Sequence, residues 1–202
     1  AQQEELAQGM QAETEPADGI AYDEHVWLSL KNAARFCEAI QKALSALDPA
    51  NAADYEANTL AYLGKLAALD ASYANAVAGA PHKTLLFGDR FPFRYLTEDY
   101  NLSYYAAFAG CSAETEASFG TIAFLAEKVD ELSLPAVLTI EGAQHEIAKT
   151  VVQNTKNKDQ AVLTLDSMQS VTQKDMEQGI TYVSIMEANL AVLREALGEK
   201  PR

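Results

Sequence analysis

The sequence predicts an α/β fold in which helices flank a four-stranded parallel sheet. Two observations predict this fold: strand-like apolar runs recur at four places, and helical patterns separate them. Strands that alternate with helices form parallel sheets. The runs cover residues 84–87, 104–108, 136–140 and 161–165, and a long helical pattern precedes the first of them. At 202 residues the chain is large enough for one sizeable core or two small ones.

The composition describes a soluble globular protein and argues against several classes of function. Hydrophobic residues make up 49% of the chain, and 29 acidic against 15 basic residues give a formal net charge of -14. This charge disfavours nucleic acid and anionic membranes as partners, and it attracts cations. No apolar run approaches the roughly 20 residues that span a bilayer, and residues 1–11 lack the zones of a signal peptide. We therefore expect a soluble, already processed chain.

The first half of the chain predicts a mobile segment followed by two helices. Residues 1–24 hold seven carboxylates and no Lys or Arg, so they bury too little apolar surface to order as a compact unit. Helical spacing then runs from Asn32 to Leu47 through Phe36 and Ile40, and Asp48-Pro49 ends it. A longer helix begins near Asn51. Its stripe comprises Leu60, Leu63, Leu66, Leu69 and Tyr73, and it ends near Gly79-Ala80-Pro81.

Two amphipathic helices are expected in the second half. The first follows Cys111, with Ser112 as its N-cap and a core-facing stripe of Phe119, Ile122, Ala126 and Val129. The last carries Val183, Met186, Leu190, Leu193 and Leu197 on one face, before Gly198 and Pro201. The two cysteines, Cys37 and Cys111, allow one disulfide in an oxidising compartment, or Cys37 is instead a small buried hydrophobic residue.

Metal-capable side chains follow several of the predicted strands. Asp89 comes after the first run, Glu141 and His145 after the third, and Asp166 directly after the fourth. The carboxyl ends of parallel strands meet at one edge of a sheet, where binding crevices form, so these residues are expected to share a site. Gly88 permits a sharp turn before Asp89. Taken alone, Asp166 is also compatible with a helix N-cap or a turn.

His25 is a further candidate ligand. It follows Asp23 and Glu24, whose carboxylates would hold an imidazole in place or raise its basicity, and it precedes Trp27. A single histidine is a weak sign of a metal site, so the alternative interpretation is a surface histidine.

Signatures of catalysis are missing from the sequence. It contains no Gly-x-Ser-x-Gly elbow, no Gly-rich phosphate loop and no Cys-x-x-Cys pair, which argues against an enzyme. The one enzymatic alternative is an acid/base pair formed by Asp89 and His145.

Tracts from about Tyr22 to Leu197 match one known pattern. They are Asp23-Glu24-His25-Val26-Trp27-Leu28 with Lys31-Asn32-Ala33, then Leu47-Asp48-Pro49-Ala50-Asn51, Thr164-Leu165-Asp166-Ser167, and Tyr182-Val183-Ser184-Ile185-Met186 with Asn189-Leu190. The first is similar to Asp-Pro-His-x-Trp-Leu. Together they resemble the metal-binding solute receptors of bacterial ABC importers, the zinc and manganese receptors of the ZnuA and TroA type, also called adhesin lipoproteins.

The resemblance implies two lobes joined by a rigid helix, with a metal held between them by two histidines and two residues of the second lobe. It implies that His25 is the second histidine and Asp166 the final carboxylate. In residues 87–96, which resemble the region of the third ligand, the ligand position holds Arg90. Arginine stays protonated and cannot coordinate a metal, so Asp89 is expected to substitute. The family's first histidine has no counterpart in the chain.

The same resemblance implies a division of the chain and a set of partners. Residues 1–24 form the acidic segment, 25–50 a remnant of the N-terminal lobe, 51–79 the linking helix and 80–202 the C-terminal lobe. The implied function is an extracytoplasmic, membrane-anchored receptor that binds zinc or manganese and delivers it to an ABC permease. A homodimer through the truncated lobe is a further expectation.

Two supporting residues and one rival function complete the expectations. Glu141 is expected to support the metal ligands, with His145 as an alternative donor. The rival is an adhesion or protein-interaction module that keeps the fold without a metal site and uses Tyr104, Tyr105 and the acidic surface.

Overall fold

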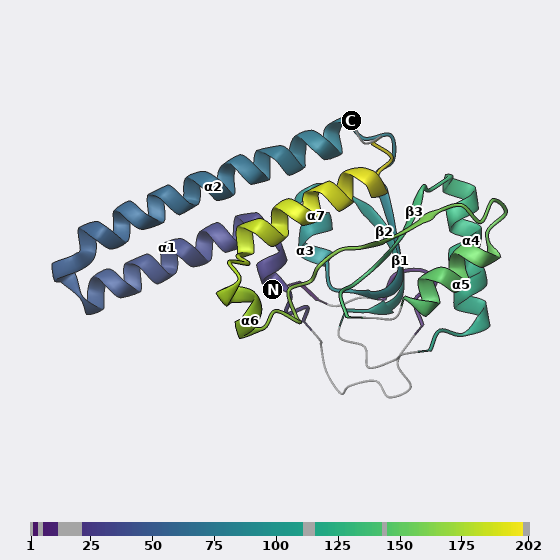
Figure 1. Cartoon of the computed structure of the whole chain (residues 1–202), viewed down its shortest axis with the longest axis horizontal. Helices are drawn as coiled ribbons and strands as arrows, with labels where there is room; N and C mark the ends of the chain where they lie inside the picture. Colours follow the sequence, from purple (N-terminus) through teal and green to yellow (C-terminus); the bar gives the residue numbers. More distant parts are fainter. Residues whose placement is uncertain (1, 4–5, 12–21, 111–115, 143–144, 200–202) are drawn as a thin grey trace.

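A four-stranded, all-parallel sheet forms the centre of the molecule, in the order β2-β1-β3-β4 (Figure 1). The computed structural model describes residues 2–3, 6–11, 22–110, 116–142 and 145–199. The strands are β1 (Thr84–Phe91), β2 (Ser103–Ala109), β3 (Ala136–Thr139) and β4 (Ala161–Thr164). The predicted α/β class and all four predicted strands are confirmed.

β1 extends beyond its predicted end, and this changes the place of Asp89. The pairing of β1 with β2 shifts register between Phe87 and Arg90, so the strand continues through an irregularity to Phe91. Asp89 therefore lies inside a strand and not in the turn that we expected after it. Gly88 is buried at the same irregularity, where a Cβ atom would come within 2.5 Å of Ala148 Cα. Its role is to let a helix approach the strand closely, and the predicted sharp turn is wrong.

Helices cover both faces of the sheet (Figure 1). On one face α4 (Phe119–Leu132) and α5 (Glu146–Asn154) pack on the strands, and on the other α7 (Tyr182–Ala196) packs on β3 and β4. Each face has its own cluster of buried apolar side chains. The shorter helices are η1 (Val26–Leu28), α3 (Arg94–Asp99) and α6 (Gln173–Glu177).

Two long helices form an arm that projects from the sheet (Figure 1). They are α1 (Leu30–Leu47) and α2 (Ala52–Gly79), joined by the turn η2 (Pro49–Asn51), and they confirm the two predicted helices. The second half of α2 joins the core, where Leu66, Leu69 and Tyr73 are buried. The Tyr73 hydroxyl donates a 2.6 Å hydrogen bond to the backbone oxygen of Met186 and so ties α2 to α7.

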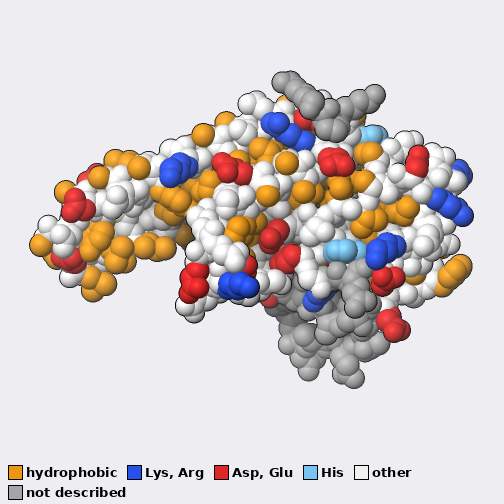
Figure 2. All heavy atoms as spheres, viewed as in Figure 1, with side chains coloured by type: hydrophobic (Ala, Val, Ile, Leu, Met, Phe, Trp, Pro, Cys, Tyr) orange, Lys and Arg blue, Asp and Glu red, His pale blue; other side chains and the backbone are white. Residues whose placement is uncertain are grey.

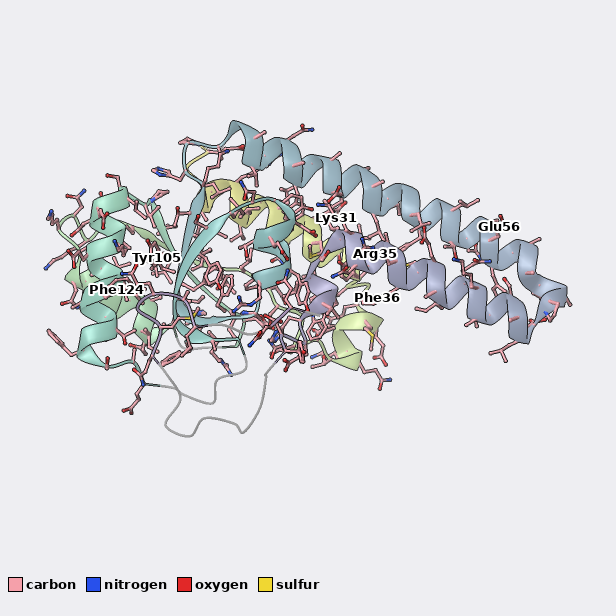
Figure 3. All side chains as sticks on the ribbon, turned by 180° about the vertical axis from the view of Figure 1, so that it is seen from behind. Lys31, Arg35, Phe36, Glu56, Tyr105 and Phe124 are labelled. Carbon is pink, nitrogen blue, oxygen red and sulfur yellow. The ribbon has the colours of Figure 1, made fainter. Side chains whose placement is uncertain are left out.

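Part of the surface of the arm is not buried as its spacing predicted. Phe36, Ile40, Leu47 and Leu60 are 44%, 58%, 84% and 62% exposed. Here α1 and α2 contact chiefly each other, so their remaining sides face solvent. Figure 2 shows hydrophobic side chains gathered over the arm, and Figure 3 marks it from behind with Phe36 on α1 and Glu56 on α2.

The helix after Cys111 starts later than predicted. Residues 116–118 are not helical, and α4 begins at Phe119 with the Ser118 side chain accepting a hydrogen bond from Thr121 N. The proposed N-cap Ser112 lies outside the described residues. Phe119 is 81% exposed because it occupies the first turn, beyond the sheet, whereas Ala126 and Val129 are buried as expected.

The acidic first segment and the second cysteine lie largely outside the described residues. Of residues 1–24, the described parts make specific contacts: Gln2 N donates to the Tyr95 hydroxyl, and Gln11 N donates to Ala107 O on β2. Cys37 is a free, half-buried thiol packed against the core, and Cys111 is not described. Within the described part of the chain, no helix is long and apolar enough to cross a membrane.

Candidate metal centre

His25 is buried and held in a fixed orientation by Asp23. The imidazole immediately precedes η1 and is 2% exposed, so the surface-histidine interpretation is wrong. Asp23 Oδ1 lies 2.9 Å from both the backbone N and the Nδ1 of His25. Because a carboxylate only accepts hydrogen bonds, Nδ1 carries a proton, and in the neutral imidazole Nε2 then carries the lone pair. This is the arrangement that orients a metal-binding imidazole.

Helix α3 fixes Asp23 in turn. The Tyr95 hydroxyl donates to Asp23 O at 2.9 Å, and Arg94 Nε lies 3.5 Å from Asp23 Oδ2. Both Asp23 and His25 are nearly inaccessible to solvent. Gly110, directly after β2, completes the enclosure, because a Cβ atom there would lie 3.2 Å from His25 Cε1 and 2.9 Å from Phe91 O.

The loop between β4 and α6, residues 165–172, closes over His25. Trp27 Nε1 donates to Ser167 O at 3.0 Å, and Gln169 Nε2 lies 3.1 Å from His25 Nε2. Tyr182 at the start of α7 donates its hydroxyl proton to Trp27 O at 2.8 Å. Residues separated by more than 100 positions in the sequence therefore meet at the imidazole.

Glu141 organises this loop from the end of β3. Its carboxylate accepts hydrogen bonds from Ser167 N and Ser167 Oγ, both at 2.7 Å, and from Gln169 N at 2.9 Å. These contacts suit the supporting role expected of Glu141, since they hold the segment that faces His25. They also occupy both carboxylate oxygens.

Asp166 occupies a turn at the end of β4 and lines a cavity of about 430 Å³. Its Oδ1 accepts from Met168 N at 2.7 Å, the local hydrogen bond of an Asx turn. Glu141, Asp175 and apolar side chains of α7 also line the cavity, and His25 does not. Burial raises the pKa of Asp166, the Met168 N–H opposes this rise, and the carboxylates of Glu141 and Asp175 add to it.

The Asp89 carboxylate joins two strands. Its Oδ1 accepts from Arg90 N at 2.8 Å and its Oδ2 accepts from Ile140 N at 3.3 Å, next to Glu141. Arg90 Nε lies 4.0 Å from Oδ1. Neither hydrogen bond involves His145, so the geometry gives no support to an acid/base pair. His145 is the N-cap residue of α5, in a left-handed conformation with φ of 61°.

The predicted site residues thus line one edge of the sheet without forming a single cage. Contacts run from Asp89 through Ile140 and Glu141 to the 165–172 loop and His25. Among the described residues, no three His, Cys, Asp or Glu side chains are close enough together to hold a metal ion.

The sequence of the whole chain identifies its family. A family model described as the periplasmic zinc-uptake complex component A, ZnuA, matches residues 1–196. The chain belongs to the ZnuA family.

Two curated relatives of this ZnuA-family chain illustrate the similarity. It is 34% identical over 181 residues to the zinc-binding lipoprotein AdcA of Streptococcus pneumoniae, a match to 89% of this chain and 35% of AdcA. It is 32% identical over 178 residues to the metal ABC transporter substrate-binding lipoprotein ScbA of Streptococcus cristatus, covering 88% and 56%. The chain therefore spans about a third of AdcA and somewhat more than half of ScbA.

Solved structures share the ZnuA-family fold. The Zn(II)-bound ZnuA-like domain of S. pneumoniae AdcA superposes with a TM-score of 0.71 at 31% identity, over 89% of this chain and 65% of that one. The metal-dependent lipoprotein YcdH of Bacillus subtilis gives 0.73 at 27% identity, over 86% and 64%.

Sequence reasoning missed two residues of this candidate site. Gln169 was missed because an amide is a poor metal donor and nothing in its spacing links it to His25. Asn189 was quoted only within a matching tract, yet its amide accepts from Asp166 N at 2.8 Å and donates to Asp166 O at 2.7 Å. The signal available for it was a polar residue directly before Leu190, within the apolar pattern of the last helix.

Proposed function

We propose that the chain is a metal-binding part of an ABC importer's solute receptor, with zinc as its cargo. The observation that carries this proposal is the buried Asp23–His25 pair, which leaves the lone pair of Nε2 directed at the 165–172 loop. A neutral imidazole held by a carboxylate is a common zinc ligand. The name of AdcA, a zinc-binding lipoprotein, supports the same cargo.

We propose His25, Asp166 and Asp89 as ligands, with Glu141 supporting them and His145 as an alternative donor. The carboxylates of Asp89 and Asp166 each accept backbone N–H groups, and among the described residues they do not lie together with His25 as a metal-binding group. Coordination therefore requires these contacts to loosen and the three side chains to come together. A coordination sphere with only three protein ligands admits water, and we therefore expect weaker binding than in a receptor with four protein ligands.

Zinc is the preferred cargo and manganese the alternative. Imidazole and carboxylate donors suit both ions, and zinc binds such donors more tightly than manganese does. The relatives' names support this order, because AdcA is named for zinc and ScbA for a metal in general.

Delivery to a membrane permease from an extracytoplasmic, lipid-anchored position completes the proposed role. The words lipoprotein and ABC transporter in the name of ScbA support it. We propose the lobe boundaries given above, with residues 51–79 as the linking helix and 80–202 as the second lobe. The exposed apolar side chains of the arm, among them Phe36 and Ile40, make a homodimer through residues 25–50 a secondary proposal.

The rival function, a protein-interaction module, receives less support from the two tyrosines named for it. Tyr104 stacks on Phe91 with ring centroids 3.6 Å apart. Tyr105 lies beside Phe124 (Figure 3). Their ring centroids are 5.8 Å apart, and Lys128 Nζ lies 5.6 Å from the centre of the Tyr105 ring. Both rings are half-buried by their own chain, which leaves little of them for a partner.

Thermal unfolding with added metal tests the proposal. We expect zinc to raise the melting temperature of the chain, manganese to raise it less, and both His25→Ala and Asp166→Ala to abolish the zinc effect, because a ligand stabilises the state that binds it. His82→Ala, which removes a histidine of the α2–β1 connection, is the matched control and is expected to retain the zinc effect. No shift in the unsubstituted chain with either metal would favour the interaction module.

A further inference from the structure

Gln169 covers the one nitrogen of His25 that is free of the Asp23 carboxylate. The two Nε2 atoms are 3.1 Å apart, and Nδ1 of the imidazole already donates to Asp23. The Gln169 amide nitrogen is therefore the donor and His25 Nε2 the acceptor. An amide N–H and a metal ion both seek the same lone pair, so they cannot occupy it together.

We propose that Gln169 is a placeholder for the metal on His25 and that it sets the metal affinity of the site. In the metal-free chain the amide fills the coordination position on Nε2, and the ion binds only after the side chain has left. This inference rests on the proposed function, since it takes His25 Nε2 as a ligand atom. In this inference Gln169 is not a metal ligand. Its amide competes with the ion for His25 Nε2.

The surroundings of Gln169 suit a side chain that leaves while its backbone stays. Glu141 accepts a hydrogen bond from Gln169 N at 2.9 Å, and the neighbouring Ser167 is held by Glu141 and by Trp27. The Gln169 residue itself is exposed, whereas His25 is 2% exposed. A change of side-chain rotamer is therefore enough to open Nε2, and such changes take picoseconds to nanoseconds at an exposed residue.

The size of the effect follows from the hydrogen bond that the metal must displace. A net hydrogen bond of this kind changes an equilibrium by about two- to tenfold. Without the amide, Nε2 faces water, which the ion displaces more easily than a tethered donor. We expect Gln169→Ala to bind zinc about two- to tenfold more tightly than the unsubstituted chain.

Calorimetric titration with zinc alone tests this expectation. Gln173→Ala is the matched control, because Gln173 is an exposed glutamine on α6 whose amide donates to Glu177. The control should bind zinc like the unsubstituted chain. Gln169→Glu should also bind more tightly, since a carboxylate cannot donate to Nε2 and adds an anionic oxygen. Equal or weaker zinc binding by Gln169→Ala, with zinc binding by the unsubstituted chain intact, overturns the placeholder role alone.

A measurement without metal separates this inference from the proposed function. In the metal-free chain, the ¹⁵N resonance of His25 Nε2 should shift in Gln169→Ala and stay in place in Gln173→Ala. An unchanged resonance in Gln169→Ala means that the contact is absent in solution and overturns the inference, whatever zinc does. Failure of zinc to bind the chain and both Gln169 variants overturns the proposed function and the placeholder role with it.

Discussion

Asn189 of α7 forms hydrogen bonds with both the backbone N and the backbone O of Asp166. Its Oδ1 accepts from Asp166 N at 2.8 Å and its Nδ2 donates to Asp166 O at 2.7 Å, and Asn189 is 1% exposed. The candidate ligand at the end of β4 is therefore positioned by a helix that follows it by more than 20 residues. Together the two bonds hold the peptide units on both sides of Asp166 in place against α7.

Replacing this amide is expected to destabilise the fold. Asn189→Leu keeps the approximate volume but leaves Asp166 N and O without these partners, which should lower the free energy of unfolding by about 1–3 kcal/mol. Urea denaturation measures it. Asn154→Ala, which removes only an exposed bond to Thr150 O, should cost less than about 0.5 kcal/mol. Equal losses in the free energy of unfolding for the two variants would contradict this role of Asn189.

The raised pKa of Asp166 predicts that removing its charge stabilises the metal-free chain. Its pKa is raised in the folded chain, so the folded state binds a proton more readily than the unfolded state. Its contribution to stability is therefore present below the unfolded pKa and is lost as pH rises through the folded one. Asp166→Asn should raise the melting temperature of the metal-free chain at pH 7 by about 1–2 °C and leave it unchanged near pH 3.

A second aspartate of the same cavity provides the control for this pH dependence. The Thr172 side chain and backbone N–H lower the pKa of Asp175, which contributes stability above its unfolded pKa that is lost as pH falls. Asp175→Asn should therefore lower the melting temperature at pH 7. Melting curves in a metal chelator from pH 3 to 7 compare the two, and the same sign for both would refute the assignment.

The hydroxyl of Tyr73 couples the arm to the sheet. It is fully buried and donates to Met186 O at 2.6 Å, and burial raises its pKa. Tyr73→Phe should lower the free energy of unfolding by about 0.5–1.5 kcal/mol through loss of this bond. Tyr55→Phe removes a hydroxyl that donates to Asp48 near the tip of the arm, and it should cost less. The order of the two losses in urea denaturation is the test.

Gly88 is expected to tolerate no side chain. A Cβ atom there would approach Ala148 Cα to 2.5 Å, so Gly88→Ala must push α5 away from β1, at a cost of about 1–3 kcal/mol. Gly64→Ala in α2 meets nothing within 4 Å and should stabilise the chain by about 0.5–1 kcal/mol, because alanine favours a helix. Thermal unfolding that gave both changes the same sign would show that packing at Gly88 is not tight.

The sequence predicted those features that depend on neighbours along the chain. The four strands follow from apolar runs between helical patterns, and the Asp23–His25 contact joins residues only two positions apart. The start of α4 was placed too early because a serine suits an N-cap at residue 112 as well as at residue 118, and spacing alone does not choose between them. Exposure of Phe36 and Ile40 was missed because spacing shows which side chains share a face, without showing whether another element covers it.

The arrangement of the site depended on contacts that no local pattern contains. His25 and Gln169 are 144 residues apart in sequence, and Asp166 and Asn189 are 23 apart. The register shift in β1 was also invisible, since the strand continues through Gly88 and Asp89 without an apolar alternation to mark it. Metal coordination by His25, Asp89 and Asp166 stays a prediction.

The two ends of α2 are packed differently. α2 has 28 residues and so extends for about 42 Å, with its later part locked into the core through Tyr73 and its earlier part supported chiefly by α1. Backbone amides beyond Leu66 should exchange with solvent deuterium only when the whole molecule unfolds, whereas those before Leu60 open by local fraying. The helix is continuous, but its stability differs along its length, so its outer turns are expected to open without unfolding the part that is packed on the core.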